Sequence, residues 1–546
     1  MFLRRFIAVT ILIVLLAGCG PVPQPTLTET VALPPTPQPT ATSISTATPV
    51  PPTPTSIPAL TLWLDPSLPD ALSEGLTVPA DIETTAREAE ATYRWVLLGL
   101  GETAAVETDW VFVAAAAFPT IPSEVSGAKL RGQWQRGGGQ ALLLTPESLA
   151  AFTALWGKPA VGAVKVVADE AILDAAWENQ GQVALLPFEQ LSPRWKALRV
   201  DGLSPFDRDF NAAAYPLALR AGLTGADALP EGWALPLSNY DSTKLTTLML
   251  TGVTALARRT AKTINEQGTA FLVQDTGGWL RSADITHVSN EVSFNEQCSP
   301  ERAASPEARF CSIPEYIEVL ELAGTDIVEL TGNHNLDYGP EAYMYTLDLY
   351  RERGWVYYGG GENAEEARQA LLVEHNGNRL AFIGCNYAGP EPVWATETYP
   401  GAATCDLDWI EAEVIRLAGE GYLPVVTFQT FESEDYKPAI MQRAGDYRRM
   451  AAAGAVVVSG SASHWPQTFE FVGDSLLHFG LGNLFFDQME RFQTRQAFQD
   501  KHVFYDGRYL GLEFLPTMLE DAARPRPMTA AERETFLTDI FEAGGW

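Results

Sequence analysis

Short apolar runs alternate with stretches of helical apolar spacing along residues 59–240. The runs predict strands, whereas the wider spacing over residues 81–98 and 146–155 predicts helices. Thr145 stands where a cap for the second helix is expected. The expected strands are 60–64, 110–117, 141–145, 164–167, 183–187 and 198–200. This alternation indicates an α/β domain.

A second alternating stretch covers residues 244–520. Residues 223–244 precede it and predict a linker, because they are rich in Gly, Pro, Asp and Ser. The expected strands are 246–252, 284–291, 327–330, 355–358, 380–385, 423–428, 455–459 and 477–479. The expected helices begin near residue 254 and cover 313–323, 340–353 and 408–417. A chain of 546 residues is too long for one core, so we expect two α/β domains, 59–240 and 244–520.

The two ends of the chain differ from this pattern. Residues 521–546 predict a helical tail, with a helix over 529–541 and Thr529 as its cap. At the other end, two arginines precede a short apolar run, and Leu16-Ala-Gly-Cys19 resembles the cleavage site of a bacterial lipoprotein signal peptide over residues 1–19. We therefore expect lipidation of Cys19 and an extracellular protein anchored on the outer face of the cytoplasmic membrane.

Residues 20–58 are nearly all Pro, Thr, Ser, Ala and Val. This composition cannot bury a core and favours extended polyproline conformations. The segment is expected to be a disordered stalk that holds the domains away from the membrane.

The charge of the chain restricts its partners. Lys and Arg number 37 and Asp and Glu number 68, so the net charge is 37 − 68 = −31. Repulsion at this charge argues against binding to nucleic acid, to anionic lipid or to a bare polyanion. It also agrees with the solubility of an exported protein.

The cysteines indicate an oxidising environment. Once Cys19 is assigned to lipidation, four of the five cysteines remain, and they flank two loops. An even number in an exported chain predicts two local disulfides, Cys298–Cys311 and Cys385–Cys405. Metal binding by these four has less support, because no Cys-x-x-Cys spacing occurs.

Residues 326–339, Asp-Ile-Val-Glu-Leu-Thr-Gly-Asn-His-Asn-Leu-Asp-Tyr-Gly, carry the clearest candidate chemistry. A buried strand is expected to end at Thr331-Gly332 and to be followed by Asn333, His334 and Asp337. Side chains at the carboxyl end of a strand in an α/β sheet lie at the edge where ligands bind. These residues are therefore expected to line a site.

Four motifs in order resemble the CapA family: residues 331–339, Gly359-Gly-Gly-Glu-Asn363, Phe382-Ile-Gly-Cys-Asn386 and Gly480-Leu-Gly-Asn-Leu-Phe-Phe-Asp-Gln488. The resemblance covers roughly residues 244–520. It implies a calcineurin-like metallophosphoesterase α/β sandwich and a role in poly-γ-glutamate capsule synthesis. To hold such a polymer, this acidic chain would need cations or a local basic strip. Residues 59–240 loosely resemble periplasmic solute-binding domains, and a structural α/β domain without a ligand is the alternative.

The sequence departs from the family at three metal-ligand positions, which are occupied by Val253, Gln429 and Ser461. Valine cannot bind a metal, and amide and hydroxyl oxygens are poor ligands for a transition metal beside imidazole. The resemblance therefore implies a degenerate site with at most one Mn, Zn or Mg ion. Its expected ligands are Glu291, His334 and His464.

The remaining roles follow from the same alignment. Catalysis, if retained, is expected from Asn333, His334, Glu432 and His464, and ligand binding from Asn290, Glu291, Asp337 and Gln429. Structural alternatives stay open: Asn333 fits a tight turn, Asp337 fits a helix cap, and Glu291 and Glu432 fit a solvated surface. The other histidines are expected to be structural or exposed, namely His287, His375, His478 and His502.

Three functions are compatible with these observations. The first is a surface lipoprotein that serves polymer synthesis, retention or export by binding the polymer or its synthesis machinery. The second is a metal-dependent hydrolase or transferase with a single ion. The third is a solute receptor that uses residues 59–240. Motifs typical of serine hydrolases, nucleoside triphosphatases and zinc proteases do not occur.

Overall fold

The computed structural model describes residues 60–546 except 100, 302–308, 431–433, 439–440 and 462. The expected signal peptide, Cys19, the stalk and Glu432 lie outside the described residues. The described residues belong to one compact unit, and the expected boundaries near 240, 244 and 520 stay predictions.

A ten-stranded mixed sheet forms from the first part of the chain. Its main path runs β2-β1-β3-β10-β4-β8-β6-β7, and β9 joins it by pairing with β4 and β5. The strands are β1 (Thr61–Leu64), β2 (Glu83–Thr84), β3 (Tyr93–Leu97), β4 (Val106–Ala117), β5 (Glu124–Val125), β6 (Leu142–Leu144), β7 (Val164–Val166), β8 (Ala184–Pro187), β9 (Trp195–Val200) and β10 (Ala218–Thr224). The helices are α1 (Asp70–Glu74), α2 (Gly127–Arg136), α3 (Pro146–Trp156) and α4 (Ile172–Glu178).

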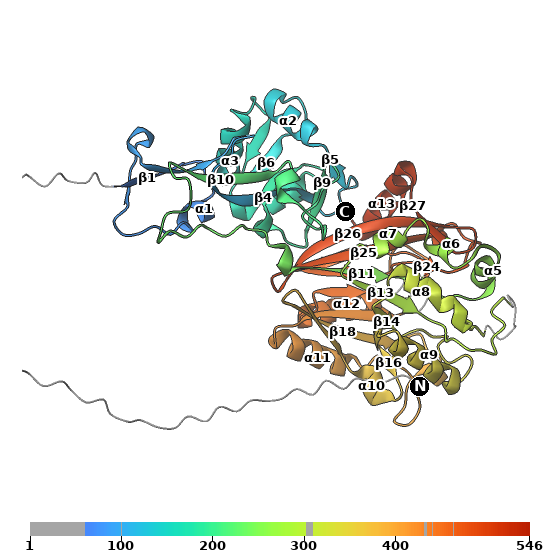
Figure 1. Ribbon diagram of the computed structural model, residues 1–546. Coiled ribbons are helices and arrows are strands. Elements are labelled where there is room, and N and C mark those ends of the chain that lie inside the picture. The colour runs from blue at the N-terminus through green and yellow to red at the C-terminus, as the bar shows by residue number, and fades with distance from the viewer. Residues whose placement is uncertain (1–59, 100, 302–308, 431–433, 439–440, 462) are drawn as a thin grey trace, which may run out of the picture. The chain divides into compact units, whose positions relative to one another are not determined.

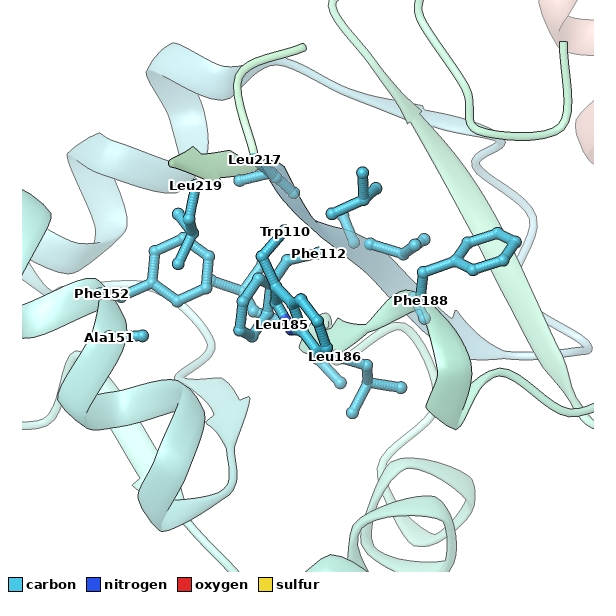
Figure 2. Close-up of a cluster of buried hydrophobic side chains, with 14 of the residues drawn as sticks. Trp110, Phe112, Ala151, Phe152, Leu185, Leu186, Phe188, Leu217 and Leu219 are labelled. Carbon is cyan, nitrogen blue, oxygen red and sulfur yellow. The ribbon is translucent and has the colours of Figure 1, made fainter. Parts of the chain in front are cut away.

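Packing of α3 on this sheet forms the core of the first part. Figure 2 shows Trp110 and Phe112 of β4 among side chains of β8, β10 and α3. The rings of Phe112 and Phe152 meet edge to face at 5.0 Å. The side chain of Thr145 accepts a hydrogen bond from the Ser148 backbone N–H, so the predicted cap of α3 is confirmed.

All six strands expected in this part are present, with ends that shift by up to four residues. The helix expected over residues 81–98 is wrong. These residues contain β2, a 3-10 turn at Glu88–Glu90 and β3. Trp95 and Leu97 are both buried in β3, which pairs with β1 and β10, so pairing along the strand overrides the helical spacing. Helix α2 was not predicted, because Gly127 and Gly132 lower its helix propensity.

The second part of the chain is built on two facing sheets. The nine-stranded sheet contains β11 (Leu245–Thr251), β12 (Val253–Thr254), β13 (Ile285–Asn290), β14 (Ile327–Glu329), β15 (Val356–Tyr358), β24 (Asn483–Phe485), β25 (Gln496–Tyr505), β26 (Arg508–Glu520) and β27 (Arg524–Pro527). The six-stranded sheet contains β17 (Leu371–His375), β18 (Asn378–Asn386), β20 (Leu423–Gln429), β21 (Val457–Ser459), β22 (Phe469–Val472) and β23 (Ser475–His478). A small pair, β16 (Gly360–Gly361) and β19 (Gly401–Ala402), stands apart from both.

Parallel strands form the centre of the six-stranded sheet and one side of the nine-stranded sheet, where β15 is a parallel edge strand. Strands β11, β13, β14 and β15 are parallel, as are β18, β20, β21 and β23. Strand β25 runs antiparallel to β11, and β26 runs antiparallel to β25 on its other side, as Figure 1 shows. The carboxyl ends of each parallel set therefore lie along one edge of its sheet.

Helices cover the outer faces of the two sheets. The helices of this part are α5 (Arg258–Gln267), α6 (Ala270–Val273), α7 (Gly277–Leu280), α8 (Glu318–Ala323), α9 (Pro340–Glu352), α10 (Ala364–Arg368), α11 (Leu407–Gly419), α12 (Met441–Ala453) and α13 (Ala530–Gly544). Buried side chains of α5 to α9 pack with Val288 and Val328 of the first sheet, and those of α11 and α12 pack with Val426 and Val458 of the second. Leu248 of β11 and Val425 of β20 belong to a separate core between the sheets.

This order of layers is helix, sheet, sheet, helix. The expected fold class is therefore confirmed: an α/β sandwich preceded by a smaller α/β part. Helix α5 begins at Arg258 rather than near 254, because β12 first pairs with β13 and β24.

The C-terminal tail packs against the same sandwich. The predicted terminal helix is confirmed as α13, and Thr529 and Glu532 form a capping box at its start. Phe536, Leu537 and Ile540 are fully buried in the core between the sheets.

Both predicted disulfides are present. Cys298 pairs with Cys311 at a Cα–Cα distance of 6.0 Å, and Cys385 pairs with Cys405 at 5.0 Å. Within the described ranges, the helices are too short or too polar to cross a bilayer.

Candidate functional site

The sequence-predicted site residues follow the carboxyl ends of parallel strands in both sheets. Asn290 ends β13 and Glu291 follows it, while Asn333, His334 and Asp337 follow β14. Gln429 ends β20, and Ser461 and His464 follow β21. The strands thus deliver these side chains to the sheet edges where α/β proteins bind ligands.

His334 is held by a carboxylate and an aromatic ring. Its Nδ1 lies 2.8 Å from Asp337 Oδ2, and its ring packs against Phe310 at 4.5 Å. Burial lowers the pKa of His334, but the hydrogen bond with Asp337 and the negative charge of Glu291 outweigh burial and raise the pKa above its ordinary value. Asp337 therefore orients the imidazole and favours its protonated form, and it does not cap α9, whose N-cap is Gly339.

Asn333 and Gln429 connect the two sheets at this edge. The Gln429 Nε2 donates to Asn333 Oδ1 at 3.2 Å, so Asn333 does more than take a turn. Asn290 is buried, and its Nδ2 donates to the Tyr350 hydroxyl at 2.7 Å. The structure therefore gives Asn290 a role inside the nine-stranded sheet and its helices.

Glu291 is the most unusual member of the group. Its side chain is buried, and neither carboxylate oxygen has a hydrogen-bond partner within the described part of the chain. A Cβ at Gly332 would collide with the Glu291 backbone, which explains why the loop after β14 has glycine there. A buried carboxylate without a partner is costly, so Glu291 is the residue at this edge that most needs a cation.

His464 is oriented by Asn483 from the motif at 480–488. The Asn483 Nδ2 donates to the carbonyls of His464 and Thr494, so its Oδ1 accepts from His464 Nδ1 at 2.7 Å. The imidazole also packs against Phe486 at 4.5 Å. Two cavities of about 220 and 310 Å³ lie beside this part of the site, one lined by His464 and Trp465 and the other by Arg258, and they share Gln488 and Glu490.

An apolar cluster surrounds Val253, the position where the resemblance to the CapA family implies a metal-binding aspartate. Val253 is fully buried there and packs with Ala255, Val292 and Phe486, and Phe310 covers the cluster from the side. Arg258 lies over the Phe310 ring at 4.5 Å and over the Phe486 ring at 5.0 Å. The two rings that contact His334 and His464 thus share one guanidinium.

Asp487 holds this arginine. The carboxylate pairs with Arg258, accepts from the Arg259 backbone N–H at 3.0 Å, and lies 3.6 Å from the Arg259 guanidinium. Asp487 therefore satisfies an orphan N–H in the first turn of α5. Sequence reasoning missed Arg258, Phe310, Phe486 and Asp487, although two of them stand in the motif at 480–488.

Ser461 belongs to a separate buried network. It donates to Glu329 Oε1 at 2.7 Å, and Glu329 Oε2 lies 3.2 Å from His287 Nε2. Burial raises the pKa of Glu329, but His287 and the hydroxyls of Ser461 and Thr331 outweigh it and lower the pKa below its ordinary value. This network lies within the sandwich, in agreement with the structural role expected for His287.

The side chains present do not fit a two-metal centre. Val253 cannot bind a cation, and Ser461 is engaged by Glu329. Over the described residues, no three or more His, Cys, Asp or Glu side chains converge as a metal site would require. The expected ligands Glu291, His334 and His464 therefore do not form a complete site among these residues.

Comparison with known proteins agrees with the motifs. Residues 247–488 match the family model described as bacterial capsule synthesis protein PGA_cap. The capsule biosynthesis protein CapA of Bacillus anthracis is 24% identical over 302 residues, which are 54% of this chain and 72% of that protein. The resemblance to the CapA family is confirmed. An uncharacterized protein of Sinorhizobium fredii, y4sH, is 31% identical over 133 residues, but these are only 26% of its length. Residues 247–488 are called the CapA-like segment below.

Solved structures resemble the chain only weakly. A phosphatase from Mycoplasma pneumoniae matches with a TM-score of 0.31 and 12% identity. The match covers 54% of this chain and 98% of the phosphatase chain. An ABC-type phosphate transport receptor from Vibrio cholerae matches with a TM-score of 0.24 and 13% identity. This match covers 30% of this chain and 86% of the receptor chain. At these scores the similarities carry no argument about function.

Proposed function

We propose that this protein is a surface-anchored CapA-type lipoprotein that binds an anionic capsule polymer during its synthesis, retention or export and does not hydrolyse phosphoesters. The apolar cluster around Val253 carries the proposal. A buried valine, two phenyl rings and the Arg258 guanidinium occupy the region where a second cation would need a carboxylate. The positive charge of Arg258 also opposes a metal ion at this position.

Anchoring rests on the sequence. Leu16-Ala-Gly-Cys19 and the Pro- and Thr-rich residues 20–58 support a lipid anchor with a stalk. The confirmed disulfides agree with an exported chain.

The test combines a cellular and a chemical measurement. We expect deletion of the protein, or Cys19→Ser, to reduce the capsule polymer retained on the cell surface. Purified wild-type protein should show no phosphodiesterase turnover near ordinary enzyme rates of about 1 to 1,000 per second. Turnover in that range together with two tightly bound metal ions per chain would overturn the proposal. Unchanged polymer in the deletion strain would also overturn it.

A second candidate is a hydrolase or transferase with a single metal ion. The observation that favours it is Glu291, whose buried carboxylate oxygens have no partner among the described residues and whose charge acts on His334. Titration with Mn²⁺ decides between the two: one tight site that is lost in Glu291→Gln favours this candidate. Absence of binding in wild type removes it.

A further inference from the structure

One segment of this acidic chain has the opposite charge. Residues 127–166 contain Lys129, Arg131, Arg136, Lys158 and Lys165 but a single carboxylate, Glu147, so the segment carries 5 − 1 = +4 in a chain of −31. We call it the basic segment. It folds into α2, β6, α3 and β7, of which β6 and β7 pair and β7 ends the main path of the first sheet.

A cavity of about 440 Å³ lies against α2 in the basic segment. Lys129, Gln133 and Arg136 line it from the helix, and residues 137–139, all glycine, line it from the turn that follows. The three side chains are spaced i, i+4 and i+7, so they lie on one face of α2. The rise between Lys129 and Arg136 is about 10 Å along the helix axis. No carboxylate lines this cavity.

The cations of the basic segment are not used in ion pairs. Within the described residues, no Asp or Glu oxygen lies within 4.0 Å of the charged nitrogens of Lys129, Arg131, Arg136, Lys158 or Lys165. Arg131 instead lies over the Trp156 ring at 5.7 Å. Lys129 and Arg136 are both exposed. Their charge is therefore available to a ligand.

Local contacts hold the helix that presents these charges. The Ser126 hydroxyl accepts from the Lys129 backbone N–H and caps α2. Gln133 Oε1 accepts from the Gly139 backbone N–H at 3.1 Å, which fixes the glycine turn against the helix. A Cβ at Gly132 would collide with the Arg136 guanidinium, so this glycine leaves room for the arginine to lie along the cavity.

We propose that this cavity binds the carboxylates of an anionic polymer that carries one carboxylate on each repeat. The choice of polymer rests on the proposed function. The location of the binding site rests on the positive charge of the basic segment and on the cavity beside α2. A polyanion is repelled by a surface of net charge −31, and only a local positive region within about 8 Å can overcome this repulsion at physiological salt. A cavity of this volume accommodates several repeat units rather than a single carboxylate group. Lys129 and Arg136, on one face of α2, contact successive carboxylates of a single polymer chain.

The experiment compares two double variants of the full-length lipidated protein in detergent micelles. Lys129→Gln with Arg136→Gln removes both charges that line the cavity. Lys158→Gln with Lys165→Gln removes the same charge from the same segment without touching the lining, and serves as the matched control. Purified poly-γ-glutamate is the probe, with linear polyphosphate as a second arm, and circular dichroism verifies that each variant is folded.

We expect wild type to bind poly-γ-glutamate and the Lys129/Arg136 double variant to lose about tenfold or more in affinity, with a shallower salt dependence. The Lys158/Lys165 control should lose less than about threefold, because it changes only the longer-range field. Equal losses in the two double variants would overturn the cavity as the binding site. Tighter binding of polyphosphate than of poly-γ-glutamate would overturn the carboxylate class.

The outcomes also separate this inference from the proposed function. Wild-type binding that the Lys129/Arg136 double variant retains in full would overturn the cavity and leave the polymer-binding function standing. Absence of poly-γ-glutamate binding by wild type would overturn both.

Discussion

Cations are used in opposite ways in two regions, the edge of the CapA-like segment where its parallel strands end and the basic segment. At the edge, Arg258 and Arg259 pair with Asp487, whose side chain is 5% exposed, and Arg258 is further covered by two phenyl rings. In the basic segment, Lys129 and Arg136 are exposed and have no carboxylate within 4.0 Å among the described residues. Charge at the edge is used to hold the fold, and charge on α2 remains available for binding.

This difference reverses what the motifs alone suggest. The motifs place function at the strand ends of the sandwich, where an enzyme of this fold would hold its metal ions. In this chain that region contains Val253 and a paired arginine, while an open cationic cavity lies in the part of the chain that precedes the family match. Four predictions test this difference between the two regions.

Asp487→Ala should destabilise the protein most, by about 3 to 5 kcal/mol. The substitution leaves Arg258 half-buried without its partner and removes the acceptor for the Arg259 backbone N–H in α5. Urea denaturation measures the loss. Asp487→Asn, which keeps the shape and one acceptor oxygen, is the control and should lose less. If Asp487→Ala changes stability by under about 1 kcal/mol, the edge does not depend on this pairing.

Val253→Asp should cost about 3 kcal/mol, because it places a carboxylate in a fully buried apolar cluster. Thermal unfolding gives the measurement, and Val253→Thr, which buries only a hydroxyl, is the milder control. If Val253 belongs to a packed apolar cluster, Mn²⁺ should not restore the stability of the Val253→Asp variant. Recovery of stability in Mn²⁺ by Val253→Asp, but not by wild type, would reveal a metal site in place of the cluster.

As pH falls, the stability of the fold should decrease at pH values at which polymer binding by the basic segment is still unchanged. Burial lowers the pKa of His502 from 6.5 to about 4, although the Asp500 charge partly opposes this. The folded state therefore resists protonation that the unfolded state accepts. The resulting loss of stability is negligible well above pH 6.5, grows as pH falls, and reaches about 3 kcal/mol near pH 4.

Denaturation between pH 7.5 and 5 checks this prediction, and His502→Gln should flatten the dependence in that window. Below about pH 4.5 the loss should steepen, because Glu329 and Glu513 have lowered pKa values and their stabilisation disappears as they take up protons. Polymer binding should stay constant from pH 7.5 to 5.5, since Lys, Arg and the polymer carboxylates all remain charged. A parallel decrease of binding and stability would show that the two regions are coupled.

The Lys129→Gln with Arg136→Gln double variant should change stability by less than about 0.5 kcal/mol, because it breaks no ion pair in the described structure. Its melting temperature beside that of wild type gives the measurement. A loss above about 1 kcal/mol would mean that these charges serve the fold, and the contrast with Asp487 would fail.

Much of the architecture could be predicted from neighbouring residues. The strand positions, the caps Thr145 and Thr529 and the two short disulfide loops depend on spacing and local chemistry, which a sequence displays directly. The helix expected over 81–98 was wrong because β3 takes its structure from pairing with β1 and β10. Both partner strands lie outside residues 81–98, so the local spacing does not reveal them.

Most of the strands, the motifs that resemble the CapA family and the valine at position 253 could be identified from the sequence alone. What surrounds Val253 depends on the tertiary structure, since Arg258 and Asp487 lie 229 residues apart and are brought together where β24 pairs with β12, just before α5. The tertiary structure also decided which cations are free. Lys129 looks like any other lysine in the sequence, and its availability depends on the absence of a carboxylate opposite it, which is a property of long-range contacts and not of neighbouring residues.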